Sequence, residues 1–381
     1  MRHLLNTVIL GLALAPAAAL ACGGLFPDTS SNEGATFAGQ AVLIDRRADR
    51  VDLHVRLTLA PGAEALAWVL PVAPGATLAL GDDAVFTALD ELTAPQVTIE
   101  RKVSGGCSAG DSAGGAPGDR VQVQAAGRLG DYEYAIIASG DAQAAVTWLQ
   151  DNGFRLPDGA AEALQPYATQ GMDLLGVRLA RKAAAATEAG APTPLVVSLA
   201  DPGSDALPLF PLGLSALSAD GPLPVVIYVI GPGRATVQGQ QVVTVADVAD
   251  DLAVRALPSN LDDAFVSPKA DYLGLVRYWQ SQREGQVWVV EAALEGVPSQ
   301  GPLAPFARDG AMITRLFAEL PPAHITDVRL GWDGREPMSP TQYRSVGDDE
   351  SCRATGGPGP ATWALLAGLL LFGLRRRRPL P

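Results

Sequence analysis

Apolar and polar residues alternate along parts of this chain, which is the pattern of a strand that buries one of its faces. The clearest case is residues 51–59, where every second residue is apolar. A second strand is expected at residues 40–45, and the polar residues 46–50 between the two segments predict a turn. The pattern therefore predicts an antiparallel hairpin near the N-terminus.

The rest of the chain predicts mostly strands and a few helices. Asp82 and Asp83 stand where helix N-caps belong, and Asn152 with Gly153 forms a typical helix stop. The mixture predicts a β-rich α+β fold with antiparallel sheets and a few packed helices, as one body or as two subdomains. Further strands are expected at 65–72, 96–103, 120–126, 132–139, 195–199, 212–217, 224–230, 241–245, 286–293 and 324–332, and helices after Asp83 and at 141–151, 158–169, 272–282 and 310–320.

Two segments interrupt this pattern. Residues 104–119 are rich in Gly, Ser and Ala and cannot bury enough apolar surface to order themselves. No Gly-Lys-Ser or Gly-Lys-Thr follows them, which argues against a phosphate-binding loop.

Residues 184–194 contain an Ala run, a Gly and two prolines. They are a candidate linker between a first β-rich part, residues 22–183, and a second one, residues 195–345.

The N-terminus carries an export pattern. Arg2 and His3 precede an apolar run at residues 4–20, and Ala19 and Ala21 suit cleavage between Ala21 and Cys22. Residues 1–21 are therefore predicted to be a signal peptide. Lipidation of Cys22 is the alternative, but Ala19 stands where a lipoprotein signal has Leu, so cleavage without lipidation is favoured.

The C-terminus carries a second targeting pattern. A spacer at residues 346–360 contains Gly and Pro, the apolar run 361–374 follows, and residues 375–381 form a basic stop. A membrane span needs about 20 apolar residues, so this run is a short transmembrane helix at best. The expected partner is the membrane, contacted through this helix. Arg375, Arg376, Arg377 and Arg378 would remain cytoplasmic, with the body in the periplasm.

The same tail is open to a second interpretation. Cys352, the sequence Gly-Gly-Pro-Gly at residues 356–359, the apolar run and the arginines together resemble the myxobacterial C-terminal sorting signal. That resemblance implies cleavage near Cys352 by a C-terminal processing protease and transfer to the cell surface. The sequence alone leaves both interpretations open.

Composition and charge describe the body between these ends. The chain is 48% apolar and 18% charged, as expected for a globular protein with a real core. Its formal net charge is −13. Residues 1–21 and 353–381 hold six of the 28 basic residues and no acidic ones, which leaves residues 22–352 with 22 basic against 41 acidic residues and a net charge of −19. Nucleic acid and anionic lipid headgroups are therefore not expected as partners of the body.

Three cysteines, Cys22, Cys107 and Cys352, occur in a chain predicted to reach an oxidising compartment. An odd count leaves one cysteine unpaired. A disulfide between Cys22 and Cys107 is the working hypothesis, because it would join the new N-terminus to the Gly-rich loop. Cys352 would then belong to the tail.

No catalytic, cofactor-binding or metal-binding residue is predicted. His54, on the polar face of its strand, is expected at the surface, and only His324 accompanies it in the body as a candidate base. Neither Ser139, Ser215 nor Ser218 lies in a Gly-x-Ser-x-Gly motif. Two His are too few for zinc at a recognised spacing. Aspartates at 247, 250 and 251 or at 262 and 263 lack the spacing of a calcium loop.

Four segments resemble one family. They are Cys22-Gly23-Gly24, residues 67–72, residues 129–132, and Trp148-Leu149 with the Asn-Gly-Phe that follows at 152–154. Together they resemble domain of unknown function 2330, a family of secreted bacterial proteins, and the similarity extends to about residue 344. No activity is established for the family, so the resemblance implies no catalytic residues.

These patterns predict an exported protein, tethered to a membrane or to the cell surface, that acts as a non-enzymatic structural or interaction module of the cell envelope. Its partner would be an envelope protein or polysaccharide. One alternative is a hydrolase of envelope polymers that uses carboxylates. Another is a carbohydrate-binding adhesin whose groove is lined by aromatic residues, the candidates being Tyr228, Tyr272, Tyr278, Trp279, Trp288 and Trp332.

Overall fold

The predicted hairpin lies in the largest sheet of the protein. In the computed structural model, β2 (Phe37–Arg46) and β3 (Arg50–Leu59) pair antiparallel, with Val42 opposite Val55. The structure describes residues 24–27, 37–59, 66–101, 127–130, 132–138, 141–179, 192–200, 207, 209–219, 221–255, 268–283 and 287–346.

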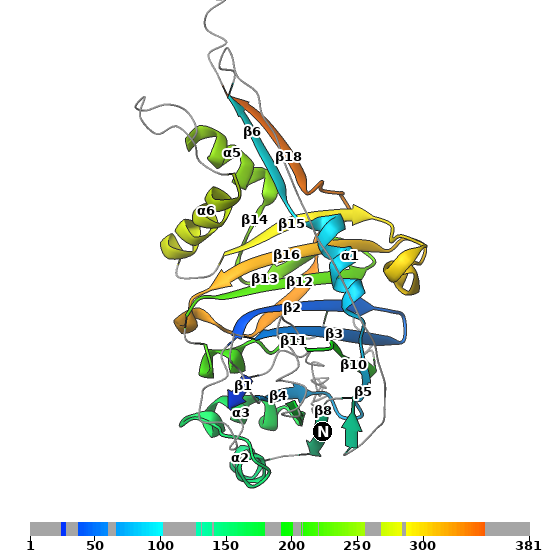
Figure 1. Ribbon diagram of the computed structural model, residues 1–381, viewed down its shortest axis with the longest axis vertical. Helices are drawn as coiled ribbons and strands as arrows, with labels where there is room; N and C mark the ends of the chain where they lie inside the picture. The colour runs from blue at the N-terminus through cyan, green and yellow to red at the C-terminus, as the bar shows by residue number, and fades with distance from the viewer. Residues whose placement is uncertain are drawn as a thin grey trace, which may run out of the picture.

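Eight strands form this main sheet, in the order β14-β15-β16-β12-β2-β3-β10-β5 (Figure 1). Neighbouring strands are antiparallel except for the parallel pairs β12–β2 and β14–β15. Strands from both halves of the chain thus lie side by side. The remaining bounds are β5 (Thr77–Leu80), β10 (Leu195–Ala200), β12 (Leu223–Gly231), β14 (Gln241–Thr244), β15 (Val287–Glu295) and β16 (Met312–Leu320).

A second, antiparallel sheet lies below the first in Figure 1, in the order β1-β4-β9-β8-β7. Two smaller sheets complete the described strands, a three-stranded one and a parallel pair that projects at the top of the view. Their bounds are β1 (Gly24–Pro27), β4 (Leu66–Val72), β7 (Gly127–Leu129), β8 (Tyr132–Ala138) and β9 (Asp173–Leu179), then β11 (Leu209–Phe210), β13 (Ala235–Gln238) and β17 (Val328–Trp332), and finally β6 (Gln96–Arg101) and β18 (Thr341–Val346).

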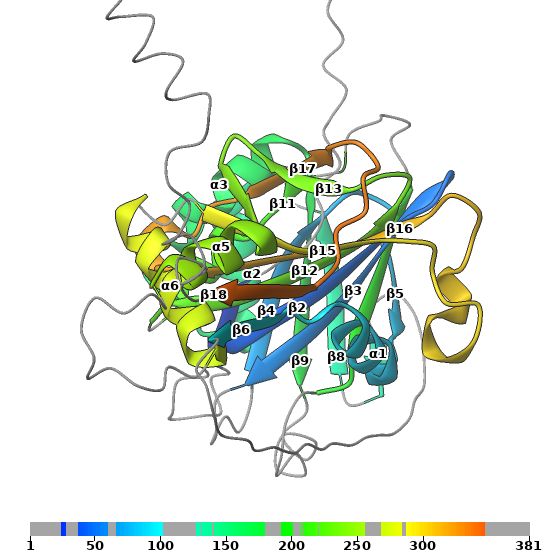
Figure 2. The ribbon, with the colours of Figure 1, turned by 90° about the horizontal axis from the view of Figure 1, so that it is seen from above.

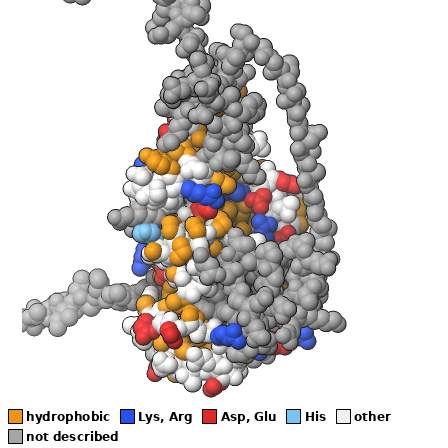
Figure 3. Space-filling model, turned by 60° about the vertical axis from the view of Figure 1, so that its left-hand side comes forward, with side chains coloured by type: hydrophobic (Ala, Val, Ile, Leu, Met, Phe, Trp, Pro, Cys, Tyr) orange, Lys and Arg blue, Asp and Glu red, His pale blue; other side chains and the backbone are white. Residues whose placement is uncertain are grey.

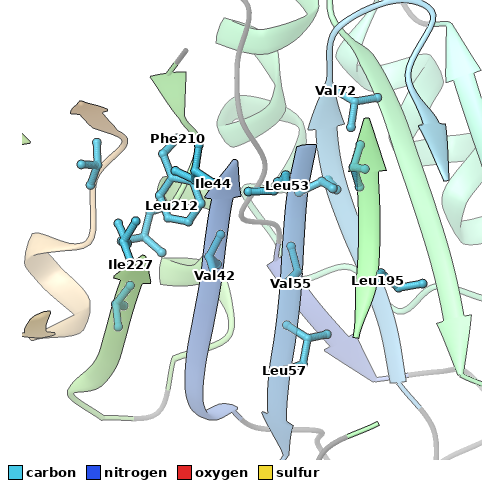
Figure 4. Close-up of a cluster of buried hydrophobic side chains, with 14 of the residues drawn as sticks. Val42, Ile44, Leu53, Val55, Leu57, Val72, Leu195, Phe210, Leu212 and Ile227 are labelled. Atoms are coloured by element: carbon cyan, nitrogen blue, oxygen red, sulfur yellow. The ribbon is translucent and has the colours of Figure 1, made fainter. Parts of the chain in front are cut away.

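The main core fills the space between the two large sheets. Because side chains alternate along a strand, Val42 and Ile44 of β2 and Leu53 and Val55 of β3 all point to this side. They are fully or almost fully buried, and Figure 4 shows them side by side with Phe210 and Ile227. The second sheet contributes Trp68, Leu70 and Leu175 among others. The alternation read from the sequence is therefore the burial pattern of the core.

Helices cover the two outer faces, which gives four layers. α2 (Ala142–Asp151) and α3 (Ala160–Thr169) pack on the outside of the five-stranded sheet. α1 (Asp83–Thr93) and the 3₁₀ helix η2 (Gly301–Phe306) pack on the outside of the eight-stranded sheet. α5 (Val245–Arg255) and α6 (Pro268–Gln282) cover the other end of that face (Figure 2). The predicted β-rich α+β fold is confirmed.

The helix ends follow the predicted capping residues. The Asp82 side chain accepts a hydrogen bond of 2.9 Å from the Ala84 backbone N–H, and so begins α1. α2 ends at Asn152, and Gly153 follows with a φ of 88°, a left-handed conformation that favours glycine. Local side-chain chemistry therefore decides these boundaries.

Two predicted elements are wrong. Residues 310–320, expected to be helical, contain the strand β16, all nine residues of which are buried. A strand covered by layers on both faces loses its alternation and can no longer be told from a buried helix. Residues 212–217, expected to be a strand, contain the 3₁₀ helix η1 (Gly213–Leu217) instead.

The predicted membrane contact through a C-terminal helix is corrected. Within the ranges that the structure describes, no helix is long and apolar enough to cross a membrane. α6 has 15 residues, whereas a span needs about 20. Residues 361–374, on which the prediction rested, lie outside the described part of the chain. The proposed linker at 184–194 also lies largely outside it, so the division into two parts stays a prediction.

Candidate functional site

Charged and phenolic side chains gather on the outer face of the eight-stranded sheet, where the helices cover it. Since Ile227 and Leu316 point into the main core, the neighbours Tyr228 and Arg315 point outward. Tyr228 and Arg315 lie directly opposite each other on β12 and β16. Strand alternation thus places a cation and a phenol together under a layer of helices.

A β-bulge brings a carboxylate to the same place. The register between β15 and β16 shifts at Glu291, because Val290 lies opposite Leu316 while Ala292 lies opposite Arg315. A bulge inserts one extra residue into a strand and redirects its side chain. The Glu291 carboxylate consequently lies beside Arg315, with its Oε2 atom 2.5 Å from Arg315 Nε.

Arg315 joins this carboxylate to α1. Its Nη1 atom donates to Oδ1 of Asp90 at 2.6 Å and to the hydroxyl of Tyr228 at 2.9 Å. The Tyr228 hydroxyl in turn donates to the same Oδ1 atom at 2.5 Å. On the other side of Asp90, Arg56 of β3 donates to Oδ2 at 3.1 Å and stacks over the ring of Phe86 at 4.9 Å.

The last residue of this hydrogen-bonded group, Tyr272, lies on α6. The hydroxyl of Tyr272 donates to Oε1 of Glu291 at 2.6 Å. We call this group the Arg315 network. It links α1 and α6 to four strands of the sheet, and its members are Arg56, Asp90, Tyr228, Tyr272, Glu291 and Arg315.

The two carboxylates of the network lie in different surroundings. The Glu291 side chain is 2% exposed, while that of Asp90 is 39% exposed. Burial raises the pKa of Glu291 above its ordinary value, although Arg315 and Tyr272 oppose the shift. Burial also raises the pKa of Asp90, but Tyr228, Arg315 and Arg56 together lower it more, so that pKa lies below its ordinary value.

All four carboxylate oxygens of the network have a hydrogen-bond donor. Oδ1 of Asp90 accepts from Tyr228 and Arg315, and Oδ2 accepts from Arg56. Each oxygen of Glu291 accepts from one partner. A buried charge is tolerated only when it is paired and hydrogen-bonded, and this arrangement meets that condition. The Arg315 network is therefore suited to crosslink the helices to the sheet through ion pairs and hydrogen bonds.

A second charged group lies at the turn of the β2–β3 hairpin. The buried Asp45 accepts from Arg47 Nε at 2.7 Å. Asp52 accepts from Arg50 Nε at 2.8 Å and from the hydroxyl of Ser198 on β10 at 2.6 Å. These contacts join the hairpin turn to the neighbouring strand.

His54 differs from its prediction as a surface residue. It does lie on the outward face of β3, but it is half-buried, with its ring 5.3 Å from that of Phe306 and tilted by 68°. Its pKa is lowered to about 4, chiefly by burial and to a smaller extent by Arg47, while Asp52 opposes the shift. His324 lies in another element, the 3₁₀ helix η3 (Pro322–His324).

Three of the six aromatic residues expected to line an adhesin groove lie inside the protein. Trp288 and Tyr228 are fully buried and Tyr272 nearly so, which leaves their ring faces inaccessible to a sugar, whereas Trp279 and Trp332 are partly buried. Tyr278 is exposed on α6, at 47%. Figure 3 shows one face of the molecule, on which acidic and basic side chains lie among apolar ones.

The remaining predicted residues lie outside the described part of the chain. They are the cleavage residue Ala21, the cysteines Cys22, Cys107 and Cys352, and the basic stop Arg375, Arg376, Arg377 and Arg378. Cleavage, disulfide pairing and sorting therefore stay predictions. Among the residues that are described, no group of three or more His, Cys, Asp or Glu could hold a metal ion.

The sequence contained a signal for the network that its motifs did not reveal. Glu291 and Arg315 lie in the middle of the mostly apolar strands Val287–Glu295 and Met312–Leu320, whose other charged residues, Glu295 and Glu319, lie at or near the strand ends. Charged residues are almost never fully buried unless they are paired. An acid in the middle of one such strand and a base in the middle of the next therefore indicate a buried ion pair.

Fold and network together define a four-layer protein with two sheets at its centre, helices outside them, and a buried ionic crosslink on the larger sheet. The chain belongs to the family described as uncharacterized protein conserved in bacteria, domain of unknown function 2330, whose family model matches residues 16–308. The resemblance of the sequence to this family is thus confirmed, while the resemblance of the tail to a sorting signal stays a prediction. No curated protein matches the chain, and no solved structure matches it.

Proposed function

We propose that this protein is exported and acts as a non-enzymatic structural or interaction module of the cell envelope. The observation that carries this proposal is the Arg315 network. Both of its carboxylates are held by guanidinium and phenol donors, as suits an internal crosslink. A general base must instead be free to take a proton from a substrate.

Charge and the N-terminal pattern support the same proposal. The apolar run at residues 4–20, with Ala19 near its end and Ala21 directly after it, favours export with cleavage before Cys22. The acidic body disfavours nucleic acid as a partner. The proposed partner is an envelope protein or polysaccharide, which the protein meets at the cell surface if the tail is processed near Cys352.

The test is mass spectrometry of both termini of the protein, isolated from its own host after fractionation of cytoplasm, periplasm and cell surface. We expect a mature N-terminus at Cys22 and a C-terminus near Cys352 in the surface fraction. Substitution of Ala19 and Ala21 by Gln should block cleavage, whereas Ala17→Gln is the matched control inside the apolar run. An uncleaved protein confined to the cytoplasm would contradict the proposal.

A carboxylate hydrolase of envelope polymers is the second candidate. One observation favours it: Asp90 and Glu291 contact the same guanidinium, yet their pKa values shift in opposite directions. Paired carboxylates with divergent pKa values are a common arrangement of acid and base catalysts.

The two candidates predict different phenotypes for Asp90→Asn and Glu291→Gln. In a hydrolase, both variants would stop the release of reducing ends from isolated envelope polysaccharide while they remain folded. In a structural module, both lower the free energy of unfolding, and wild-type protein releases nothing. Glu319→Gln serves as the control, since Glu319 lies on the same strand as Arg315 but pairs with Arg277.

A further inference from the structure

The loop between β15 and β16 crosses the outer face of the eight-stranded sheet. We call residues 296–311 the strap; they contain η2, and their ends are joined by a 2.9 Å hydrogen bond from the Gly296 N–H to the Ala311 carbonyl. Leu303 and Phe306 of the strap are buried in one apolar cluster with Leu43 and Ile230 of the sheet. The strap is therefore a cover whose apolar side faces the sheet.

Two arginines hold the strap to the hairpin beneath it. Arg308 donates to the carbonyl of Arg46 at 2.6 Å and to that of Ile230 at 3.1 Å. Arg47 donates from the hairpin to the Pro305 carbonyl at 2.9 Å. Arg308 Nη1 also lies 2.7 Å from Oδ1 of Asp45, an ion pair without the alignment of a hydrogen bond.

His54 lies under this cover. Its ring meets the ring of Phe306 edge to face, so the closed strap shields part of the ring from water. Charged groups face this region from every element around it. They are Asp45 and Arg47 on β2 and its turn, Asp52 and Arg56 on β3, Arg308 on the strap, and Asp83 and Asp90 on α1, while β10 offers the neutral Ser198.

We propose that the strap is an acid-released cover, and that protonation of His54 beneath Phe306 loosens it from the sheet. A charged imidazolium in this position would lose hydration against the Phe306 ring and be repelled by Arg47, and the loss of hydration outweighs the attraction of Asp52. Opening lets water reach the ring. It also exposes the apolar side chains of Leu303 and Phe306, which the closed strap buries.

The direction of the effect follows from proton linkage. The pKa of His54 is about 4 in the closed protein and about 6.5 for an exposed His, so the open form binds the proton more tightly. Acid therefore favours opening across the window between these two values. From pH 7 to pH 5 the ratio of open to closed strap should rise roughly 20-fold.

Asp45 acts in the opposite direction. Burial raises its pKa, although Arg308 and Arg47 oppose that shift, so the closed protein binds a proton at Asp45 more tightly than an exposed Asp does. Protonation of Asp45 consequently favours closure. The pKa of Asp90 lies below its ordinary value, so this carboxylate stays ionised between pH 7 and pH 5. The acid response in that window is thus assigned to His54.

The experiment uses the full chain and two measurements. Proton NMR follows the ring of His54 between pH 3 and pH 8, and hydrogen exchange, corrected for the intrinsic rate at each pH, follows the strap amides at pH 7 and pH 5. We expect His54 to titrate far below 6.5 and the strap to lose roughly 20-fold in protection at pH 5. The amides of β4 and β9 should keep their protection from exchange at both pH values.

Two variants test whether His54 causes the pH dependence of strap protection. His54→Gln cannot titrate and should abolish the pH dependence of strap protection, whereas the matched control His324→Gln should leave it as in wild type. Phe306→Ala uncovers the ring and should move the pKa of His54 towards 6.5. This second variant keeps the test decisive if His54→Gln does not fold. The proposal is overturned if strap protection is equal at both pH values, if His54→Gln responds as wild type does, or if Phe306→Ala leaves the His54 pKa unchanged.

Discussion

Replacement of Glu291 by Gln should be one of the more damaging single substitutions in this protein. Gln keeps the shape of the side chain and removes its charge, which leaves the buried guanidinium of Arg315 without its 2.5 Å carboxylate partner. Breaking a buried ion pair by removing one partner costs about 3 to 5 kcal/mol. Arg315 keeps Asp90 at 2.6 Å and Tyr228 at 2.9 Å, so we expect a loss of about 3 kcal/mol, the lower end of that range.

The assay is urea unfolding at pH 7, followed by tryptophan fluorescence. The midpoint should fall while the slope with urea stays constant, because the surface exposed on unfolding does not change. Glu291→Leu combined with Arg315→Met removes both charges, and Tyr272→Phe removes the buried hydroxyl that would otherwise lose its acceptor. The triple variant should recover much of the loss, since apolar side chains of similar volume replace a buried ion pair at little cost.

Arg277→Gln is the matched control. Arg277 pairs with Glu319 at 2.6 Å, but its side chain is 61% exposed, and exposed pairs contribute about 0 to 1 kcal/mol. Burial does not decide the strength of these ion pairs if the free energy of unfolding of Glu291→Gln lies within about 0.5 kcal/mol of wild type. The same follows if Glu291→Gln and Arg277→Gln lose equal amounts of stability.

Three further substitutions test other parts of the structure. Because the pKa of Asp90 is lowered, its carboxylate adds to the free energy of unfolding above an ordinary Asp pKa, and this contribution is lost as the pH falls below that value. Asp90→Asn should therefore be less stable than wild type at pH 7. Its urea midpoint should also fall less than that of wild type between pH 5 and pH 3. Gly176→Ala places a Cβ 3.0 Å from the Phe154 ring, and the substitution should lower the free energy of unfolding by about 1 to 3 kcal/mol. An unchanged midpoint of thermal unfolding would mean that the contact between Phe154 and β9 is loose. Asp82→Ala removes the cap of α1 and should cost about 1 kcal/mol, with Asp82→Asn as the variant that retains it.

The hairpin, the helix caps and the family could all be read from the sequence because each depends on neighbouring residues. Alternation over residues 51–59 required only that one face of a strand be buried, and β3 buries that face. Asp82 caps α1 through a bond to the N–H two residues further on. Where the determining contact is local, the residue pattern is sufficient.

Three features were decided only by the tertiary structure, and each depends on segments far apart in the chain. β16 is a strand because layers cover both of its faces, which erases the alternation that would have identified it. Arg315 meets Asp90 across 225 residues, a distance that no local pattern can bridge. His54 occupies a polar position of an alternating strand and was therefore expected in water. It lies instead beneath Phe306, because a loop from the C-terminal half folds over it, and that burial sets its pKa.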